Sequence, residues 1–225
     1  MLFLVLAVSA AAACARLGVW QLDRRHQRRA MNAVIAARMK APPVAVNGLR
    51  GDTSVNRFRR VRIAGTPDTT HEFMLTFRGN NGSPGVDILT PVHVAGEDSA
   101  VLVNRGWIYS PDGMNADLSR WREVDTVFTG YIDSFESNTG VDSLRRNGIR
   151  RMDYTAVTRG IPYPVADYYL VAQADSGGDP ETAGVVRLHP PKLDNGPHLN
   201  YALQWFAFAT IALTGGGIVA ARSMR

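Results

Sequence analysis

The chain has 225 residues, of which 45% are hydrophobic and 20% are charged, and its net charge is +5 at pH 7. This length allows one folded domain with its own core in addition to terminal segments. The single cysteine, Cys14, excludes an internal disulfide, a cysteine-pair metal site, a thiol–disulfide oxidoreductase and covalent c-type haem. A basic chain can bind nucleic acid, but no nucleic-acid motif is present, so we expect no nucleic-acid partner.

Both ends of the chain are apolar. Residues 1–22 carry no charge before Arg16, and residues 201–221 carry none. Because roughly 20 mostly apolar helical residues cross a bilayer, we predict transmembrane helices at residues 1–22 and 198–221, with both termini on one side of the lipid bilayer. A cleaved signal peptide is the alternative for the first segment. The uncharged start and the apolar residues up to Leu22 favour a retained anchor.

Charges beside the two spans give conflicting indications of orientation. Four arginines lie within residues 24–29, directly after the first span, whereas Arg222 and Arg225 follow the second. Under the positive-inside rule the first group places the central domain in the cytoplasm, and the second favours a cytoplasmic C-terminus. Arginines at this depth also bind anionic lipid headgroups.

The sequence between the spans predicts a helical extension and then a β-rich domain. Residues 23–41 are rich in helix formers, and Pro42-Pro43 ends this helix. We expect residues 42–197 to form one domain. Alternating or apolar runs predict its strands, at residues 57–65, 72–77, 86–94, 100–104, 126–132, 168–172 and 185–186. Short, closely spaced strands predict an antiparallel sheet folded toward a barrel or sandwich. The expected fold class is an α+β membrane protein in which two terminal transmembrane helices flank one antiparallel β-rich domain.

Local patterns within this domain give more detailed expectations. In the strand at residues 72–77, Phe73, Leu75 and Phe77 share one face. The turn formers at residues 78–85 predict a hairpin loop. We further expect a short helix at residues 151–159 and a polar loop at residues 173–182.

Signals of enzymatic chemistry are weak. The chain has no phosphate-binding glycine loop, no His-Glu-x-x-His motif and no nucleophile elbow. Its five histidines do not occur at metal-ligand spacing. We therefore expect a protein that is not an enzyme, and a membrane-anchored enzyme of unknown reaction is the least favoured hypothesis.

One histidine stands apart because it lies at the entrance to the second span. In a helix, His198, Tyr201 and Trp205 would lie on one face, since residues three, four and seven apart are neighbours. An ionisable residue at membrane depth suggests a functional site, and imidazole is a good ligand of haem iron. The alternative is an interfacial belt of polar aromatic residues without any ligand. The chemistry of these residues alone favours this alternative over a ligand site.

Each span also contains one glutamine, Gln21 in the first and Gln204 in the second, and each follows or precedes a tryptophan. An amide in hydrocarbon needs a hydrogen-bonding partner, which a neighbouring helix can supply. We predict that the two spans pack together near this face of the membrane, with His198 in a groove between them.

Three segments together resemble a known family. They are Leu17-Gly18-Val19-Trp20-Gln21-Leu22, Val103-Asn104-Arg105-Gly106-Trp107 and His198-Leu199-Asn200-Tyr201-Ala202-Leu203-Gln204-Trp205-Phe206. Their order and the hairpin layout resemble the Surfeit-locus (Surf-one, Shy-one) family of cytochrome c oxidase assembly factors. The resemblance extends from about residue 17 to residue 221.

This resemblance implies a chaperone of the respiratory chain that assists haem a insertion into subunit I of cytochrome c oxidase. It implies subunit I and the haem a synthesis machinery as partners, and a bacterial inner (cell) membrane location with the central domain in the periplasm. His198 matches the proposed haem contact, and so would be the metal ligand, with Tyr201 and Trp205 nearby. Arg105 and Trp107 match the family's Arg-Gly-Trp segment, which would contact the haem propionates, subunit I or the core of its own domain. A scaffold that stabilises an assembly intermediate without binding haem is the alternative function.

Overall fold

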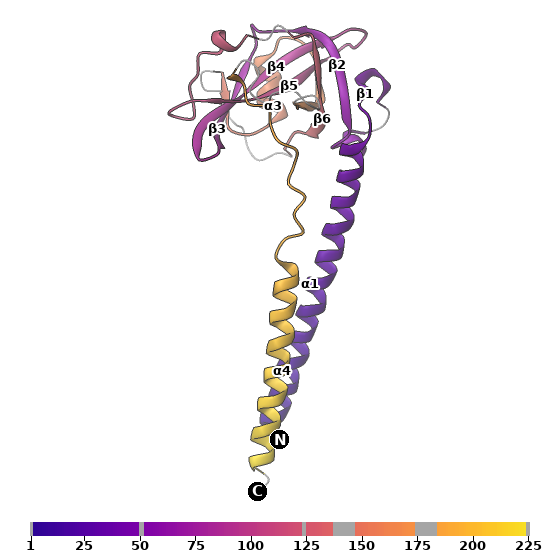
Figure 1. Cartoon of the computed structure of the whole chain (residues 1–225), viewed down its shortest axis with the longest axis vertical. Helices are drawn as coiled ribbons and strands as arrows, with labels where there is room; N and C mark the ends of the chain where they lie inside the picture. Colours follow the sequence, from indigo (N-terminus) through magenta and orange to yellow (C-terminus); the bar gives the residue numbers. More distant parts are fainter. Residues whose placement is uncertain (1, 50–51, 123–124, 137–146, 174–183, 224–225) are drawn as a thin grey trace. The chain divides into compact units, whose positions relative to one another are not determined.

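The structure is a computed structural model, and it describes residues 2–49, 52–122, 125–136, 147–173 and 184–223. The chain divides into two compact units (Figure 1). The helical unit consists of residues 1–37 and 192–225, and the β unit consists of residues 38–191.

The helical unit contains two long helices, α1 (Leu2–Lys40) and α4 (His198–Ser223). The predicted first span and its extension form one continuous helix, which ends before Pro42-Pro43 because proline cannot continue it. Both helices are long and apolar enough to cross a membrane. Only 11% and 17% of the residues in their most apolar stretches are buried, so neither helix has the burial expected of a core helix in a soluble protein.

The contact between α1 and α4 is built from small residues that recur every seven positions. Ala11 and Gly18 are buried on α1, and Ala202, Ala209 and Gly216 are buried on α4. Small side chains at helical spacing allow close approach of two backbones, which is how apolar helices associate where the hydrophobic effect is absent. Figure 1 shows the two helices side by side and antiparallel within this unit.

In its described residues, the β unit contains eight strands, two short α-helices and two 3₁₀ helices. The strands are β1 (Val44–Ala45), β2 (Arg60–Pro67), β3 (Phe73–Asn80), β4 (Ser83–Val94), β5 (Ala100–Tyr109), β6 (Val127–Ser134), β7 (Gly148–Ile149) and β8 (Val165–Ala172). The helices are η1 (Val46–Gly48), α2 (Thr53–Asn56), η2 (Leu118–Trp121) and α3 (Tyr154–Gly160). The short helix expected at residues 151–159 is α3, which begins after Asp153, whose side chain caps it by accepting from the Ala156 amide. The polar loop expected at residues 173–182 falls outside the described residues, apart from Gln173.

The sheet closes into a barrel-like ring of five strands. Its order is β1-β2-β6-β8-β5-β4-β3-β7, and β2 also pairs with β4. Closure occurs because β4 is long: its first residues pair with β3, and Val92, His93 and Val94 pair with β2. The ring is therefore β2, β6, β8, β5, β4 and back to β2.

The prediction of an antiparallel sheet is wrong in part, because the sheet is mixed. Pairs β1–β2, β3–β7 and β5–β8 are parallel, and the other pairs are antiparallel. Neighbours in a closed ring can all alternate in direction only when the number of strands is even. In a ring of five strands at least one neighbouring pair must be parallel, and here that pair is β5–β8.

Two further expectations about β3 and its hairpin are corrected. Phe73 and Leu75 are buried, but Phe77 is 52% exposed, because a bulge between Leu75 and Arg78 interrupts the alternation. The residues expected as a loop at 78–85 mostly extend the two strands, which leaves only Asn81 and Gly82 as the turn. Both of these residues have positive φ, as in a two-residue hairpin turn.

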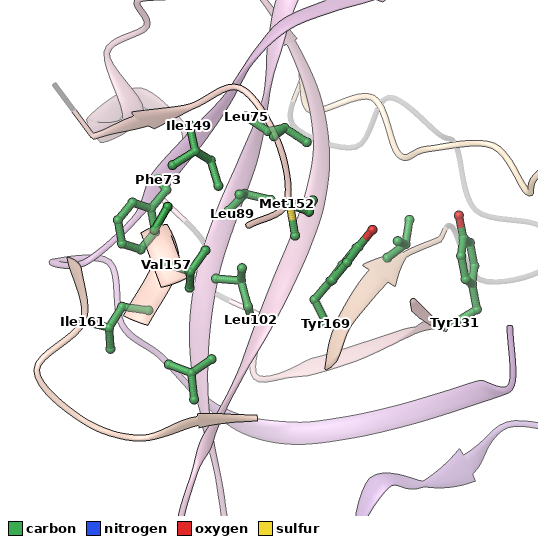
Figure 2. Close-up of a cluster of buried hydrophobic side chains, with 13 residues drawn as sticks. Phe73, Leu75, Leu89, Leu102, Tyr131, Ile149, Met152, Val157, Ile161 and Tyr169 are labelled. Carbon is green, nitrogen blue, oxygen red and sulfur yellow. The ribbon is translucent and has the colours of Figure 1, made fainter. Parts of the chain in front are cut away.

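Alternate side chains along the strands supply two main clusters. The inner cluster includes Val61, Ile63, Val103, Phe128 and Leu170. The outer cluster lies on the other face of the same strands and includes Ala156 and Val157 of α3. Figure 2 shows its members, among them Leu75, Leu102, Tyr131, Val157 and Tyr169.

Candidate functional site

His198 is the first residue of α4, and it is hydrogen-bonded to α1. Its Nδ1 lies 2.8 Å from Oε1 of Gln21. Since an amide oxygen can only accept, this contact assigns the proton to Nδ1 and leaves Nε2 with its lone pair in the neutral ring. Both residues are half-buried. The predicted packing of the two spans near this position is thereby confirmed, although the partner of Gln21 is His198, whereas Gln204 is exposed.

The backbone just before α4 keeps the free edge of the imidazole open. Gly196 has φ of +68°, and a Cβ at this position would lie 3.3 Å from Nε2 of His198. Glycine adopts this left-handed conformation without steric cost. Any larger residue would crowd the one ring nitrogen that has no hydrogen-bond partner within the described helical unit.

The aromatic residues of α4 divide between the helix contact and the outer surface. Phe206 packs on α1, where a Cβ added to Gly18 would lie 2.6 Å from Cε1 of the phenyl ring. Tyr201 is exposed, and Trp205 is half-buried and makes an edge-to-face contact with Phe208 at 5.9 Å between ring centroids. Phe206 therefore fills part of the predicted groove, and the surface beside His198 is formed by Tyr201 and Trp205.

The segment that leads into α4 is tied to α1 by contacts that the sequence patterns did not suggest. Nε of Arg28 donates to the Asp194 carbonyl at 3.3 Å. The side-chain amide of Asn32 donates to the same carbonyl at 3.1 Å and to Oδ1 of Asn195 at 3.3 Å. These contacts restrain the residues next to His198. The only sequence signal for them is one asparagine within an otherwise basic and apolar helical stretch.

Arg105 lies in the β unit, at a bulge in β5. Ile88 pairs with Gly106 and Leu89 pairs with Asn104, so Arg105 is the additional residue. Gly106 has φ of +128°, and a Cβ there would lie 2.4 Å from the Val186 carbonyl oxygen, so this position requires glycine.

The guanidinium of Arg105 is buried and ion-paired inside its own domain. Its Nη1 donates to Oε1 of Glu72 at 2.8 Å, and its Nη2 donates to the Trp121 carbonyl. The hydroxyl of Thr90 donates to the same Glu72 oxygen at 2.6 Å. Arg105 and Glu72 are only 2% and 5% exposed. The sequence left three possible contacts for Arg105, which were the haem propionates, subunit I and the core of its own domain. The structure shows a contact with the core of its own domain.

Trp107 lies on the opposite face of β5 from Arg105. The bulge shifts the alternation by one residue, so Asn104 and Trp107 share a face and line the same pocket. The indole Nε1 donates to the Arg78 carbonyl at 3.2 Å. The backbone of Trp107 pairs with Val186 as an isolated bridge, which is all that forms of the strand expected at residues 185–186.

The five predicted site residues are thus distributed over two units. His198, Tyr201 and Trp205 come together on α4, whereas Arg105 and Trp107 belong to the β unit. Within the described residues no group of three or more His, Cys, Asp or Glu side chains could hold a metal ion.

Comparison with known proteins places the chain among relatives that share most of its length. The model of the SURF1 family matches residues 8–210. An uncharacterized SURF1-like protein of Mycobacterium bovis is 29% identical over 220 residues, which cover 93% of this chain and 78% of that protein. SURF1-like proteins of Rickettsia felis and Drosophila melanogaster are 22% and 25% identical, covering 86% of this chain in each case and 85% and 69% of those proteins. The chain belongs to the SURF1 family.

Proposed function

We propose that this protein is an oxidase assembly factor that carries haem a transiently and assists its insertion into subunit I of cytochrome c oxidase. SURF1 family members are known generally as oxidase assembly factors, and they act without catalysis. The observation that carries the haem proposal is the imidazole of His198, whose Nδ1 is held by Gln21 while Nε2 is open. A hydrogen bond to the ring nitrogen that does not bind the metal sets the tautomer and ring orientation of metal-ligating histidines.

Haem a is the cargo in this proposal, and the residues around His198 supply what the cargo needs. Nε2 of His198 would hold the iron, and the rings of Tyr201 and Trp205 would contact the porphyrin. Arg25 is half-buried one helical turn beyond Gln21 on α1, and its guanidinium would pair with a propionate. A single axial ligand suits a carrier, because release requires only one bond to break.

The proposal gives Arg105 a structural role and assigns the haem contact to the residues near His198. Arg105 uses its guanidinium on Glu72 and Trp121 within the β unit. Trp107 contributes to the same domain through its bonds to Arg78 and Val186. Both residues would then affect assembly by maintaining the surface that subunit I contacts.

The proposed location is the bacterial inner membrane, with α1 and α4 as its two spans in the lipid bilayer and the β unit in the periplasm. The length and apolar character of the two helices support membrane association. The family resemblance implies the periplasmic side. It also implies the two partners, which are subunit I and the haem a synthesis machinery. A cysteine introduced at the exposed Asp98 and tested with a membrane-impermeant thiol reagent would report the side, because labelling of intact spheroplasts is expected only for a periplasmic domain.

The decisive test is the visible spectrum of the full-length protein, purified in detergent after coexpression with the haem a biosynthetic enzymes. We expect a reduced haem a band in the wild type and its loss in His198→Ala. His26→Ala is the matched control, because His26 is exposed on α1 outside the contact with α4. Equal haem content in His198→Ala and the wild type would refute the ligand assignment.

A scaffold that never binds haem is the second candidate function. The hydrogen bond between His198 and Gln21 is also consistent with this role. The contact between His198 and Gln21 joins two helices whether or not a ligand is present. A colourless wild-type protein that still copurifies with subunit I, in cells shown to contain haem a, would select the scaffold. Gln21→Leu separates the two roles further, since it removes this hydrogen bond between α1 and α4 but keeps the imidazole of His198.

A further inference from the structure

The β unit contains a pocket that the proposed haem role does not use. It has a volume of about 380 Å³ and lies on the face of the sheet that carries the outer cluster. Leu75, Met152 and Val171 supply apolar lining, and Tyr131 and Tyr169 supply aromatic rings. Figure 2 shows the hydroxyl groups of both tyrosines pointing the same way, toward one end of the cluster.

One oxygen of a buried carboxylate in this pocket lacks a hydrogen-bond partner among the described residues. Asp87 on β4 is 4% exposed, and its Oδ2 accepts from the Asn104 amide at 3.1 Å. Its Oδ1 is buried and has no hydrogen-bond partner among the described residues. An unsatisfied buried acceptor costs free energy, and the cost is larger for a charged group. The bulge at Arg105 contributes to this site, because it places Asn104 and Trp107 together on the pocket face.

A donor close to Asp87 is also unsatisfied. Nε of Arg78 is buried without a hydrogen-bond partner and lies 3.9 Å from Oδ2 of Asp87. These two atoms are the buried side-chain nitrogen and oxygen atoms that remain unpaired in the described part of the chain. The pocket therefore presents one unpaired acceptor and one unpaired donor on neighbouring side chains.

The charges around the pocket favour an uncharged ligand. Asp133 and Glu136 line it together with Asp87, and Arg187 lines it together with Arg78. An anionic ligand would face three carboxylates, and a cationic ligand would face two guanidinium groups. Burial, assisted by the negative charge of Asp133, raises the pKa of Tyr131 to about 12, so this hydroxyl adds no charge at neutral pH.

We propose that this pocket binds a neutral group that donates one hydrogen bond to Asp87 and accepts one from Arg78, namely a carboxamide or a hydroxyl. The apolar and aromatic lining accommodates the carbon skeleton attached to that group. The group could belong to a small molecule or to a side chain of a partner polypeptide, since both present the same chemistry to the pocket. The proposal concerns the β unit alone and is independent of haem binding at His198.

Four fragments that share one ring and differ in the polar group test the proposal directly. Benzamide and benzyl alcohol are neutral and both donate and accept, benzamidine is a cation, and benzoate is an anion. The full-length protein in detergent, labelled with 3-fluorotyrosine, is titrated with each fragment and followed by fluorine NMR. The signals of Tyr131 and Tyr169 are assigned from Tyr131→Phe and Tyr169→Phe. We expect the two neutral fragments to shift these signals and the two charged fragments to bind at least tenfold more weakly.

Asp87→Asn tests the role of the carboxylate while conserving its shape. Loss of the charge is expected to weaken benzamide binding about tenfold, because hydrogen bonds to charged groups exceed those between neutral groups by roughly that factor. Asp98→Asn is the matched control, since Asp98 is exposed and does not line the pocket. If Asp87→Asn fails to fold, Arg78→Gln at the more exposed partner is expected to weaken binding several-fold.

Three results would overturn the proposal. The first is absence of any shift with all four fragments, which would mean that water or a direct Asp87–Arg78 pair satisfies both atoms. The second is tighter binding of benzamidine or benzoate than of the neutral fragments. The third is unchanged benzamide binding in Asp87→Asn. If the proposal holds, a peptide with a glutamine side chain competes with benzamide when the natural source is a polypeptide, and fails to compete when the source is a small molecule.

Discussion

Replacing Arg105 by methionine is the most direct test of whether this residue supports the domain or contacts a cofactor. Methionine retains much of the apolar stem but removes the guanidinium. Glu72 then loses the bond from Nη1 at Oε1, where the Thr90 hydroxyl still donates, and the Trp121 carbonyl loses the bond from Nη2. The carboxylate side chain is only 4% exposed, so water cannot replace the lost cation.

The expected loss of stability is large because the buried carboxylate of Glu72 loses its ion pair with Arg105. Removing one partner of such a pair typically costs about 3–5 kcal/mol. Removing both charges, in Arg105→Met with Glu72→Leu, leaves no uncompensated ion and is expected to recover at least half of that loss. The non-additivity of the two substitutions measures the coupling between them.

Urea unfolding of the full-length protein in detergent, followed by tryptophan fluorescence, measures these differences. Arg120→Met is the matched control, because Arg120 forms an exposed ion pair with Asp117 at 3.4 Å. Such a pair contributes about 1 kcal/mol or less. An Arg105→Met protein as stable as Arg120→Met, with reduced haem content, would refute the structural role and return Arg105 to the haem site.

Three further outcomes follow from close contacts and hydrogen bonds. Gly18→Val should weaken the pairing of α1 and α4, since its Cβ would lie 2.6 Å from the Phe206 ring, and Phe206→Ala should restore the melting temperature in part. Gly106→Ala should lower the stability by at least about 1–3 kcal/mol in the same urea assay, because its φ is +128° and its Cβ meets the Val186 carbonyl. Burial would raise the pKa of Asp68, but hydrogen bonds, chiefly from Tyr163, outweigh it and hold that pKa well below 3.8. A depressed carboxyl pKa gives stability that is complete above the ordinary value and is lost as the pH falls. The urea midpoint should therefore drop more steeply below pH 4 in the wild type than in Asp68→Asn.

The helices and most strands could be predicted because their signals are local. Apolar length alone identified α1 and α4, and alternation or apolar runs placed β2, β3, β4, β5, β6 and β8 near their observed positions. Strand direction was not predictable in this way. It depends on closure of the ring between β2 and β4, which are not consecutive in the chain.

The errors in β3 have a local cause that the sequence pattern did not reveal. Alternation predicts that Phe77 shares the buried face of Phe73 and Leu75, but the bulge before Arg78 adds one residue and turns Phe77 outward. The dipeptide Asn81-Gly82 does carry the signal for a two-residue turn. Read on its own, it would have shortened the expected loop to its observed length.

Helical spacing predicts which residues of the candidate site share one face of α4. His198, Tyr201 and Trp205 follow from that spacing, and the need of a membrane amide for a partner pointed to a contact at Gln21. That His198 is the partner depends on the axial alignment of two helices whose contacting residues are 177 positions apart. The alignment is set by the close approach of Gly18 and Phe206, which composition alone does not reveal.

The segment Asn104-Arg105-Gly106-Trp107 shows why a family motif need not form a single site. The bulge requires Gly106, and it places Asn104 and Trp107 on one face of the sheet and Arg105 on the other. Arg105 points to Glu72 in the core, whereas Asn104 and Trp107 line the pocket with the unpaired Asp87. Substitutions within this one motif should therefore separate into two classes. Changes at Arg105 or Gly106 should lower the stability of the β unit, and changes at Asn104 should alter what the pocket binds in a domain that stays folded.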